Sequence, residues 1–345
     1  MSRDIRSFTR AELEGLARTS GWETYRARQL YSWMWQKRAV SFSAMTDLGL
    51  RLREELSAGF HIYVPETVVR VEDRDGTIRF VFRLEDDMVI ESVYIPDGDR
   101  RTACVSTQVG CGLGCRICRT ARLGLARSLA WHEIAGQVLE IGRAVPERLT
   151  NVVFMGMGEP FANYDATMSA VEEVNAPGGI NIGARHITVS TAGLPDGIRR
   201  YASFRLQSRL AVSLNAADDA TRGSLMPVNQ RHPLADLLAA VREFTQRRGG
   251  KRVTFEYVLL RGINDRPADA RNLSSLLQGI PCKVNLIPYN AFEGSDYAAP
   301  RPREVERFAE LLYPGLPAVT IRRSRGASIG AACGQLAARL ERKDA

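Results

Sequence analysis

The sequence predicts an α/β protein whose largest part is a parallel β-sheet, preceded by a small helical region. From about residue 97 onward, short apolar runs alternate with helical patterns, which is typical of parallel strands joined by right-handed crossovers. The chain of 345 residues is long enough for one large domain and a small accessory one, since a domain averages roughly 150 residues. Periodicity alone does not decide whether the sheet stays open or curls into a barrel.

Residues 1–60 predict a small helical unit. Thr9 and Glu12 have the spacing of a capping box, which marks the start of a helix. Apolar residues then recur at the spacing of one buried helix face, namely Ala27, Leu30, Tyr31, Met34 and Trp35. We interpret this stripe as a small core. The basic residues outside the stripe face solvent or contact RNA phosphates, namely Arg26, Arg28, Lys37 and Arg38.

Residues 61–96 predict a β-hairpin and a third strand. Two β-rich runs, 68–71 and 79–83, flank the pair Asp75-Gly76, which is a strong hairpin signal. Residues 88–94 form the third run. The strands of the larger domain are then expected at 102–106, 151–155, 186–190, 209–214, 252–259, 283–287 and 319–322.

Composition narrows the class of protein. The net charge of +8 suits a polyanionic partner, although an excess of this size also occurs without one. The chain has no apolar run of about eighteen residues and no signal-peptide pattern, so we expect no membrane association. Six cysteines are too few for a secreted disulfide framework, and thiolate ligands need a reducing compartment, which favours the cytoplasm.

Three cysteines, Cys111, Cys115 and Cys118, have the spacing C-x3-C-x2-C. Structural zinc normally takes four ligands, yet no second cysteine pair follows and the four histidines are scattered singly. A [4Fe–4S] cluster is held by thiolates, and three of them leave one iron free to bind another molecule. Glycines between the cysteines let the backbone wrap around a bulky cluster. The alternatives are three unrelated buried thiols and a zinc-binding RNA module without catalysis.

This cysteine motif resembles that of the radical S-adenosylmethionine (SAM) superfamily, in which the open iron binds SAM. Three longer segments, 103–111 (ACVSTQVGC), 155–160 (MGMGEP) and 331–336 (AACGQL), resemble the RlmN/Cfr family of RNA adenine methyltransferases. The resemblance runs from about Tyr25 to Leu336. It implies a partial (βα)6, TIM-like barrel with its site at the C-terminal ends of the strands.

The resemblance also implies how the chain is divided. Residues 1–60 form a helical accessory domain that assists RNA binding, 61–96 a short β-hairpin extension, 97–326 the barrel and 327–345 a C-terminal tail. The tail carries Cys333, which must approach Cys104, so we expect it to fold back over the barrel mouth. Three arginines ahead of it suit phosphate contacts, namely Arg322, Arg323 and Arg325.

The implied SAM contacts follow predicted strands. Glycines in Met155-Gly-Met-Gly-Glu-Pro160 allow close approach to a ligand, and the resemblance implies that Gly158 and Glu159 hold the methionyl amino end of SAM. The other implied contacts lie at or near strand ends, where polar groups orient small ligands, namely Ser190, Ser213, Leu214, Asn215 and Asn290. Taken singly, each of these positions is more often an ordinary turn residue.

The resemblance implies a radical methyl transfer that uses two SAM molecules per turnover. Cys333, as a thiolate, takes a methyl group from the first SAM. The second SAM is cleaved to a 5′-deoxyadenosyl radical, which takes hydrogen from that methyl group, and the methylene radical adds to adenine C2. Cys104 resolves the adduct through a disulfide with Cys333, and Glu91 matches a proposed proton acceptor. The alternative for Cys104 and Cys333 is two inert buried thiols, but Cys333 lies in a segment of small residues, 330–335, and not in an apolar stripe.

The implied substrate is an adenosine of 23S rRNA at the peptidyl-transferase centre and, for some members, adenosine 37 of tRNA. Such a base must leave its stack to reach an enclosed cavity. We expect a flavodoxin or ferredoxin as electron donor, and a monomeric protein.

Three residues depart from the family pattern. Ile117 stands where an aromatic residue is usual, Arg119 where Ser or Ala is usual, and Asn215 where His is common. None removes a ligand, but they leave open a divergent paralogue with another RNA target. A guanidinium at Arg119 would favour the reduced cluster and raise its potential. Methylation at C8, as in the antibiotic-resistance branch, and a different radical SAM activity also stay open, although the latter enzymes lack the Cys104 and Cys333 pair.

Overall fold

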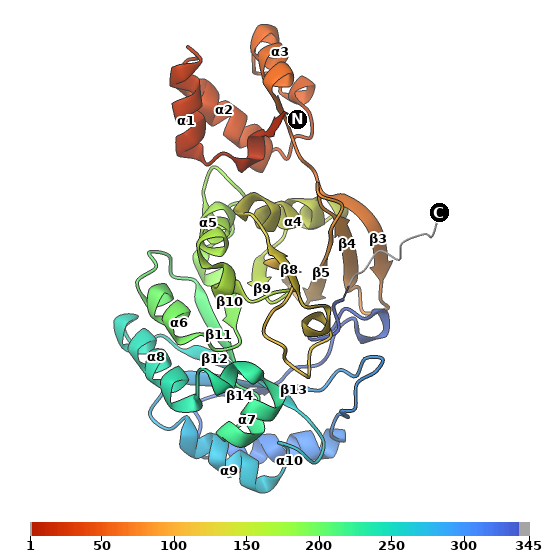
Figure 1. The fold of residues 1–345 in the computed structure, drawn as a ribbon, viewed down its shortest axis with the longest axis vertical. Coiled ribbons are helices and arrows are strands. Elements are labelled where there is room, and N and C mark those ends of the chain that lie inside the picture. Colours follow the sequence, from red (N-terminus) through yellow and green to blue (C-terminus); the bar gives the residue numbers. More distant parts are fainter. Residues whose placement is uncertain (1, 338–345) are drawn as a thin grey trace.

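The computed structural model describes residues 2–337, so Met1 and residues 338–345, the end of the predicted tail, lie outside the described range. A ten-stranded mixed sheet forms the centre of the molecule, and three helices stand at its N-terminal end (Figure 1). No helix in the described range is both long enough and apolar enough to cross a membrane.

The helices and strands have the following bounds. The helices are α1 (Arg10–Thr19), α2 (Thr24–Trp35), α3 (Leu50–Gly59), α4 (Trp131–Ala144), α5 (Tyr164–Asn175), α6 (Pro195–Ala202), α7 (Asp219–Leu225), α8 (Leu234–Arg247), α9 (Pro267–Leu276) and α10 (Pro302–Leu312). The strands of the large sheet, in spatial order, are β14 (Val319–Ile321), β13 (Cys282–Pro288), β12 (Val253–Leu259), β11 (Arg209–Ser213), β10 (Ile187–Thr191), β9 (Asn151–Phe154), β6 (Arg100–Cys104), β5 (Val89–Asp97), β4 (Ile78–Arg83) and β3 (Glu66–Glu72). Two small pairs are β1 (Arg3–Asp4) with β2 (Phe60–His61), and β7 (Gln108–Gly110) with β8 (Leu125–Ser128).

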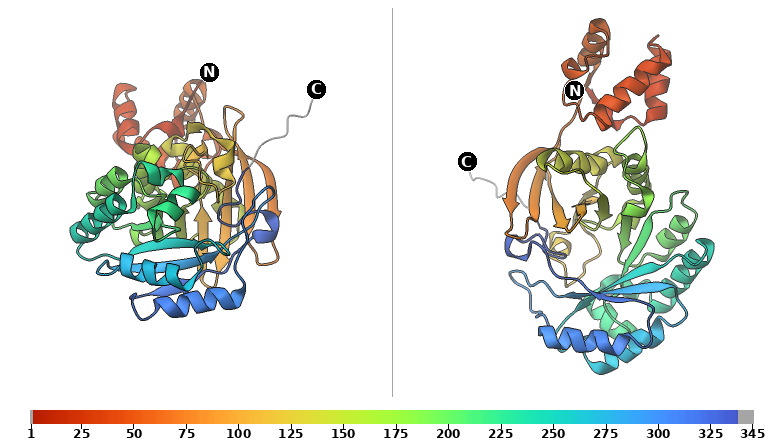
Figure 2. Two further views of the ribbon diagram at one scale, coloured as in Figure 1. Left: turned by 60° about the horizontal axis from the view of Figure 1, so that its bottom comes forward. Right: turned by 180° about the vertical axis from the view of Figure 1, so that it is seen from behind.

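The parallel part of the sheet runs in chain order. β6 pairs with β9, and each later strand pairs in parallel with the next as far as β14. Helices pack along the outer side of these strands (Figure 2). Within residues 2–337 the edge strands β3 and β14 do not pair with each other, so the barrel is open. This confirms the predicted α/β fold, and the sequential order is what right-handed crossovers produce.

The predicted hairpin continues the same sheet instead of standing apart from it. β3, β4 and β5 pair antiparallel, and β5 pairs antiparallel with β6. After β14 the chain runs back to this antiparallel arm. Arg325 forms an ion pair with Asp97 at 2.6 Å, and the N–H of Gly326 donates to the Asp75 carboxylate at 3.2 Å. The C-terminal segment is thereby held against the antiparallel arm, beside the end of β5.

The N-terminal helices pack on α4 and α5 through the stripe that the sequence predicts. The predicted capping box opens α1, and all the stripe residues of α2 are buried. Trp35 stacks on Trp131 of α4, with ring centroids 5.5 Å apart. The Tyr31 hydroxyl lies 2.7 Å from both carboxyl oxygens of Glu173 on α5 and donates to that carboxylate. The aromatic face of α2 is therefore the junction with the barrel.

Glu173 should make the stability of this junction depend on pH. Burial raises the pKa of its carboxyl to about 7, from an ordinary value of 4.5. Because the folded state then holds this proton more tightly than the unfolded state, the free energy of unfolding should fall as pH rises from about 4.5 to 7, by up to about 3 kcal/mol. Urea unfolding on either side of this window measures the fall. Glu173→Gln should remove it, and an unchanged slope in the variant would contradict the assignment.

Candidate active site

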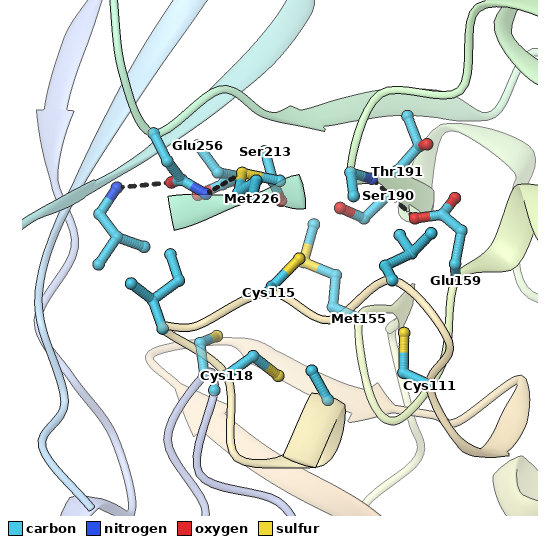
Figure 3. Close-up of a pocket in the computed structure, with 18 of the residues that line it drawn as sticks. Cys111, Cys115, Cys118, Met155, Glu159, Ser190, Thr191, Ser213, Met226 and Glu256 are labelled. Carbon is cyan, nitrogen blue, oxygen red and sulfur yellow. Dashed lines mark hydrogen bonds between the residues drawn. The ribbon is translucent and has the colours of Figure 1, made fainter. Parts of the chain in front are cut away.

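The loop of three cysteines and the carboxyl ends of β9 to β13 enclose one cavity. In Figure 3, Cys115 and Cys118 lie on one side of it, and Ser190, Ser213 and Glu256 lie on the strands opposite. The residues predicted from sequence that line this cavity are Cys111, Cys115, Cys118, Gly158, Glu159, Ser190, Ser213, Asn215, Asn290 and Cys333. Segments far apart in the sequence therefore meet at the end of the barrel where such sites form.

The cysteine loop, residues 111–118, is held firmly at its start and middle. β7 and β8 pair antiparallel on either side of it along the chain. Gly110 has a φ of +77°, and a Cβ at this position would lie 1.9 Å from the carbonyl oxygen of Gly124. Only glycine fits this approach. The N–H of Arg116 donates to the carbonyl of Leu225 on α7 at 2.9 Å, which ties the loop to that helix.

The three thiols of the loop share one cavity. Cys111, Cys115 and Cys118 all contribute to its wall. Burial raises the pKa of the Cys111 thiol to about 11, and burial followed by the neighbouring cysteines raises the pKa of Cys115. Thiolates in this cavity need a positive partner, which the irons of a [4Fe–4S] cluster supply.

Glu159 is oriented by backbone hydrogen bonds in the loop after β9. Its side chain is buried and accepts from the N–H of Phe161 at 3.0 Å and of Ala192 at 2.7 Å. Its own N–H donates to the side-chain oxygen of Gln108 at 2.9 Å. Burial raises the pKa of the Glu159 carboxyl. An ammonium group entering the cavity would favour the carboxylate form and meet an acceptor already held in place.

Gly158→Ala should weaken SAM binding. Gly158 has a φ of +97°, and a Cβ there would lie 2.6 Å from Cβ of Gln108. The clash displaces the loop that carries Glu159, so we expect a loss of about tenfold or more in SAM affinity, measured by anaerobic calorimetry. Gly262→Ala is the matched control, because Gly262 has a φ of +73° with open space around it. Equal SAM affinity in the two variants would count against this role of Gly158.

Three of the predicted SAM contacts present polar groups on the cavity wall. Ser190 is the second-last residue of β10, Ser213 is the last residue of β11, and Asn290 lies two residues after β13. The amide of Asn290 donates to the carbonyl of Cys333 at 3.4 Å, which links the strand end to the tail. Their positions fit the orientation of a small polar ligand. Their roles as SAM contacts stay predictions.

The side chains of Asn215 and Leu214 point to different surroundings, and their roles as SAM contacts stay predictions. Asn215 has a left-handed φ of +60°, which Asn tolerates. Its side chain accepts from the N–H of Val258 at 2.9 Å and donates to the sulfur of Met226 at 3.1 Å, so it joins strand ends while lining the cavity. Leu214 is fully buried in the core and is not part of the cavity wall. The side chain of Leu214 packs inward because successive residues of an extended segment point to opposite faces.

Cys104 and Cys333 share the wall of a second, smaller cavity that adjoins the first and also includes Cys118. Both are free thiols. Burial raises the pKa of Cys104 to about 12, and the neighbouring Cys333 adds to the effect. Arg322 acts on both sulfurs and hydrogen-bonds to Cys333, whose negative form raises the pKa of the guanidinium. The structure thus brings the predicted cysteine pair to one place, beside a cation and beside the cluster loop.

The three arginines that suit phosphate contacts, Arg322, Arg323 and Arg325, lie in different surroundings. Arg322 lines both cavities, Arg325 pairs with Asp97, and Arg323 is exposed. The alternation of side chains at the end of a strand sends neighbours to opposite sides.

Glu91 lies behind the tail and lines neither of the two cavities. It is buried on β5, where Arg79 donates to one carboxyl oxygen at 2.6 Å and the N–H of Ala337 donates to the other at 2.9 Å. The hydroxyl of Thr120 holds the carbonyl of Leu336 at 2.6 Å. Burial raises the pKa of Glu91, and Arg79 opposes this. Glu91 therefore anchors the end of the described tail, and its role as a proton acceptor stays a prediction.

The departures from the family pattern at Ile117 and Arg119 differ in what their surroundings explain. Ile117 is buried in an apolar cluster with Leu225 and Tyr289, so an aliphatic side chain fills its site. The N–H of Arg119 donates to the carbonyl of Gly334 at 2.7 Å, which joins the loop to the tail, but a backbone bond does not explain the choice of side chain.

Glu256 is a cavity residue that the sequence reasoning misses. It is buried in β12, where burial raises its pKa, and it accepts from the amide of Asn285 at 3.0 Å. The cavity wall thus carries two carboxyl groups, those of Glu159 and Glu256, and the guanidinium of Arg322. A signal existed, because Glu256 is a single charge within the otherwise apolar run 253–259. A lone charge in a buried strand points to a site, since burial of an unpaired charge is costly.

Comparisons with known proteins agree with this geometry. A model of the radical SAM superfamily matches residues 105–273, and a model of the ribosomal RNA large subunit methyltransferase N-terminal domain matches residues 3–62. A solved radical SAM methyltransferase from Sphaerobacter thermophilus is 43% identical, with a TM-score of 0.93, over 97% of this chain and 99% of that one.

Curated relatives extend the likeness over nearly the whole sequence. The dual-specificity RNA methyltransferase RlmN of Anaeromyxobacter dehalogenans (strain 2CP-C) is 48% identical over 97% of this chain and 92% of its own length. A probable dual-specificity RNA methyltransferase RlmN of Pelotomaculum thermopropionicum is 47% identical over 96% of this chain and 91% of its own. With the three-cysteine cavity and these full-length relatives, the chain belongs to the dual-specificity RNA methyltransferase RlmN family.

Proposed function

We propose that this chain is a radical SAM methyltransferase that methylates C2 of adenosine in RNA and carries the methyl group on Cys333. The observation that supports this most strongly is the joining of two cavities, one lined by the three cysteines of the loop and the other by Cys104 and Cys333. Adenine C2 is electron-poor and has no lone pair for an ordinary attack on a sulfonium methyl group. The bound [4Fe–4S] cluster and SAM supply a carbon radical that makes this position reactive.

The two cysteines differ in a way that assigns their roles. Cys333 lies beside Arg322 on the wall of both cavities, so its sulfur can reach a sulfonium methyl group of SAM in the main cavity and displace it. Cys104 is buried and its pKa is raised to about 12, so its thiol is protonated at neutral pH and must lose this proton before it can attack. The radical adduct first passes one electron back to the iron–sulfur cluster and loses its C2 proton. Attack of the Cys104 thiolate on the Cys333 sulfur then forms the disulfide and breaks the bond from that sulfur to the methylene carbon, which takes up a proton and leaves as the methyl group of the base. A thiol reductant must reduce this disulfide before the next turnover.

Glu91 is the candidate for moving the C2 proton during this release. Its carboxyl is buried, and burial raises its pKa, which favours uptake of a proton. Its partner Ala337 belongs to the same tail as Cys333, so movement of the tail would free the carboxyl oxygen that Ala337 occupies. Glu91→Gln should therefore slow release of the product more than methylation of Cys333.

RNA recognition is assigned to the N-terminal helices and to the rim of the cavity. Residues 1–60 place Arg28 on an exposed face of α2, away from the buried stripe. At the rim, the guanidinium of Arg122 lies 4.8 Å from the ring centroid of Phe292, and Arg122 is exposed. Stacked arginine and aromatic groups bind unstacked bases and phosphates. The proposed substrates are an adenosine of 23S rRNA and an adenosine of tRNA, each turned out of its stack.

The proposed compartment and electron donor follow from the needs of the thiolate ligands and of the radical reaction. Thiolate ligands and a reducible disulfide require a reducing compartment, which we take to be the cytoplasm. A low-potential protein such as a flavodoxin or ferredoxin would supply electrons, and the chain would act as a monomer.

Methylation of RNA by the purified protein tests this proposal. Total RNA from cells that lack the gene is incubated anaerobically with reconstituted protein, SAM and a reductant, and its nucleosides are analysed by mass spectrometry. We expect 2-methyladenosine in both rRNA and tRNA, and none with Cys333→Ala. Formation of 8-methyladenosine instead would move the protein to the C8 branch. Absence of any methylated adenosine from a preparation that contains the cluster would overturn the proposal.

A further inference from the structure

Arg222 is a buried charge without an acidic partner. It lies on α7, its side chain is completely buried, and no carboxylate in the described part of the chain forms an ion pair with it. Burying an unpaired guanidinium is costly, and proteins normally pair such a group with an anion. The carboxylate of Asp219 forms no ion pair with Arg222, although its charge favours the charged guanidinium; its Oδ1 accepts from the amide of Asn229 at 2.9 Å and from the N–H of Leu234 at 2.8 Å.

All hydrogen-bond partners of Arg222 are neutral. Its guanidinium donates to the carbonyl of Ala192 at 2.6 Å, to the carbonyls of Leu214 and Ser213 at 3.0 and 3.3 Å, and to the side chain of Asn229 at 2.8 Å. These bonds satisfy its donors but leave its charge without a counter-ion. Ala192 and Ser213 both line the main cavity, so the guanidinium lies directly behind the strand ends that form the cavity wall.

The cysteine loop packs on the helix that carries this charge. The N–H of Arg116 donates to the carbonyl of Leu225, the last residue of α7, at 2.9 Å. Cys115 lines the same cavity as Ala192 and Ser213, the residues whose carbonyls accept from Arg222. Burial lowers the pKa of Arg222 to about 10, and Cys115 and Asp219 oppose this effect. The guanidinium therefore lies behind the wall of the cavity, on the helix that holds the cysteine loop.

We propose that Arg222 is the built-in counter-cation of the iron–sulfur cluster, which stabilises the bound cluster and raises its reduction potential. The inference rests on the proposed function only in requiring a cluster at the three cysteines. A cluster with three thiolate ligands is anionic and becomes more so when it gains an electron, so a fixed cation stabilises the reduced form more. The same guanidinium holds the ends of β10 and β11, which couples cluster binding to the shape of the SAM cavity.

The test uses substitutions of Arg222 in the full-length, cluster-containing protein. Arg222→Met and Arg222→Gln remove the charge, whereas Arg222→Lys keeps it and loses the forked hydrogen bonds. Arg6→Met is the matched control, because Arg6 is equally buried and donates to two carbonyls, of Tyr63 at 2.8 Å and Ala39 at 3.0 Å. The readouts are the midpoint potential of the cluster by EPR-monitored titration and the rate of iron loss to a chelator.

In the neutral variants we expect the equilibrium to shift about tenfold or more toward the oxidised cluster, which is about 59 mV for one electron, and faster iron loss. Arg222→Lys and Arg6→Met should keep the potential of the wild type. If Arg222→Lys retains a cluster and neither neutral variant does, the positive charge at this position is needed to hold the cluster, which also supports the inference. Unchanged potentials in the neutral variants, or failure of Arg222→Lys to hold a cluster, would overturn the inference. Absence of a cluster from the wild type would instead remove the proposed function.

Discussion

Cys104→Ala should leave RNA covalently attached to Cys333 after a single round of reaction. The adduct forms through Cys333, but no sulfur remains at position 104 to attack it. The only other cysteine on the wall of this smaller cavity within residues 2–337 is Cys118, which the cluster holds. We expect a protein–RNA adduct that survives denaturation, and release of 2-methyladenosine on the order of a hundredfold lower than in the wild type. Intact-mass analysis after nuclease digestion identifies the attached nucleotide.

Two variants make this result specific. Cys104→Ala combined with Cys333→Ala should form no adduct, because the methyl carrier is missing. Cys282→Ala should behave as the wild type, because Cys282 is buried in β13 and lines neither cavity. Undiminished release of methylated product by Cys104→Ala would exclude Cys104 as the resolving thiol.

Cys115→Ala should abolish both iron binding and methylation. The remaining thiols, Cys111 and Cys118, provide two ligands, and a cubane cluster needs more. We expect the iron content after anaerobic reconstitution to fall from about four per chain to a trace, with loss of acid-labile sulfide and of the visible absorption of the cluster. Methylation of RNA should then fall below detection, because no radical is formed. Thermal unfolding of the metal-free proteins should differ little, since the loop is also held by backbone bonds.

Cys282→Ala again provides the control, because it removes a buried thiol of the same kind outside the site. Its iron content should equal that of the wild type. Stoichiometric zinc in the wild type, without iron or sulfide, would contradict the cluster and favour a binding module without radical chemistry. Full iron content in Cys115→Ala would show that the cysteine loop is not the ligand set.

Local patterns predict the elements of this protein well. The α2 stripe is buried as its spacing requires, and the Asp75-Gly76 pair lies in the turn between β3 and β4. Each strand expected in the barrel is present, with bounds that differ from the expected ones by a few residues at most. Short apolar runs between turn residues are typical of buried strands. Periodicity did not reveal that β3 to β5 continue the barrel sheet. The periodicity of a strand shows that it is a strand but not which strand it pairs with, and here β5 pairs with β6.

The residues of the site also divide into those that local motifs identify and those whose surroundings depend on packing. The cysteine loop and Glu159 were identified from short motifs, in which neighbours along the chain remain neighbours in space. The burial of the Leu214 side chain in the core and the position of Arg322 beside Cys333 depend on packing, which no motif describes.

By itself the sequence determined the ligand types, their spacing and the order of strands, because each depends on residues close together along the chain. The family resemblance implied that Cys104 and Cys333 meet, whereas only the tertiary structure placed Arg222 behind the cavity wall with neutral hydrogen-bond partners. Whether a buried charge is balanced depends on everything packed around it. That surrounding shell comes from several strands and helices at once, and no local pattern of residues records it.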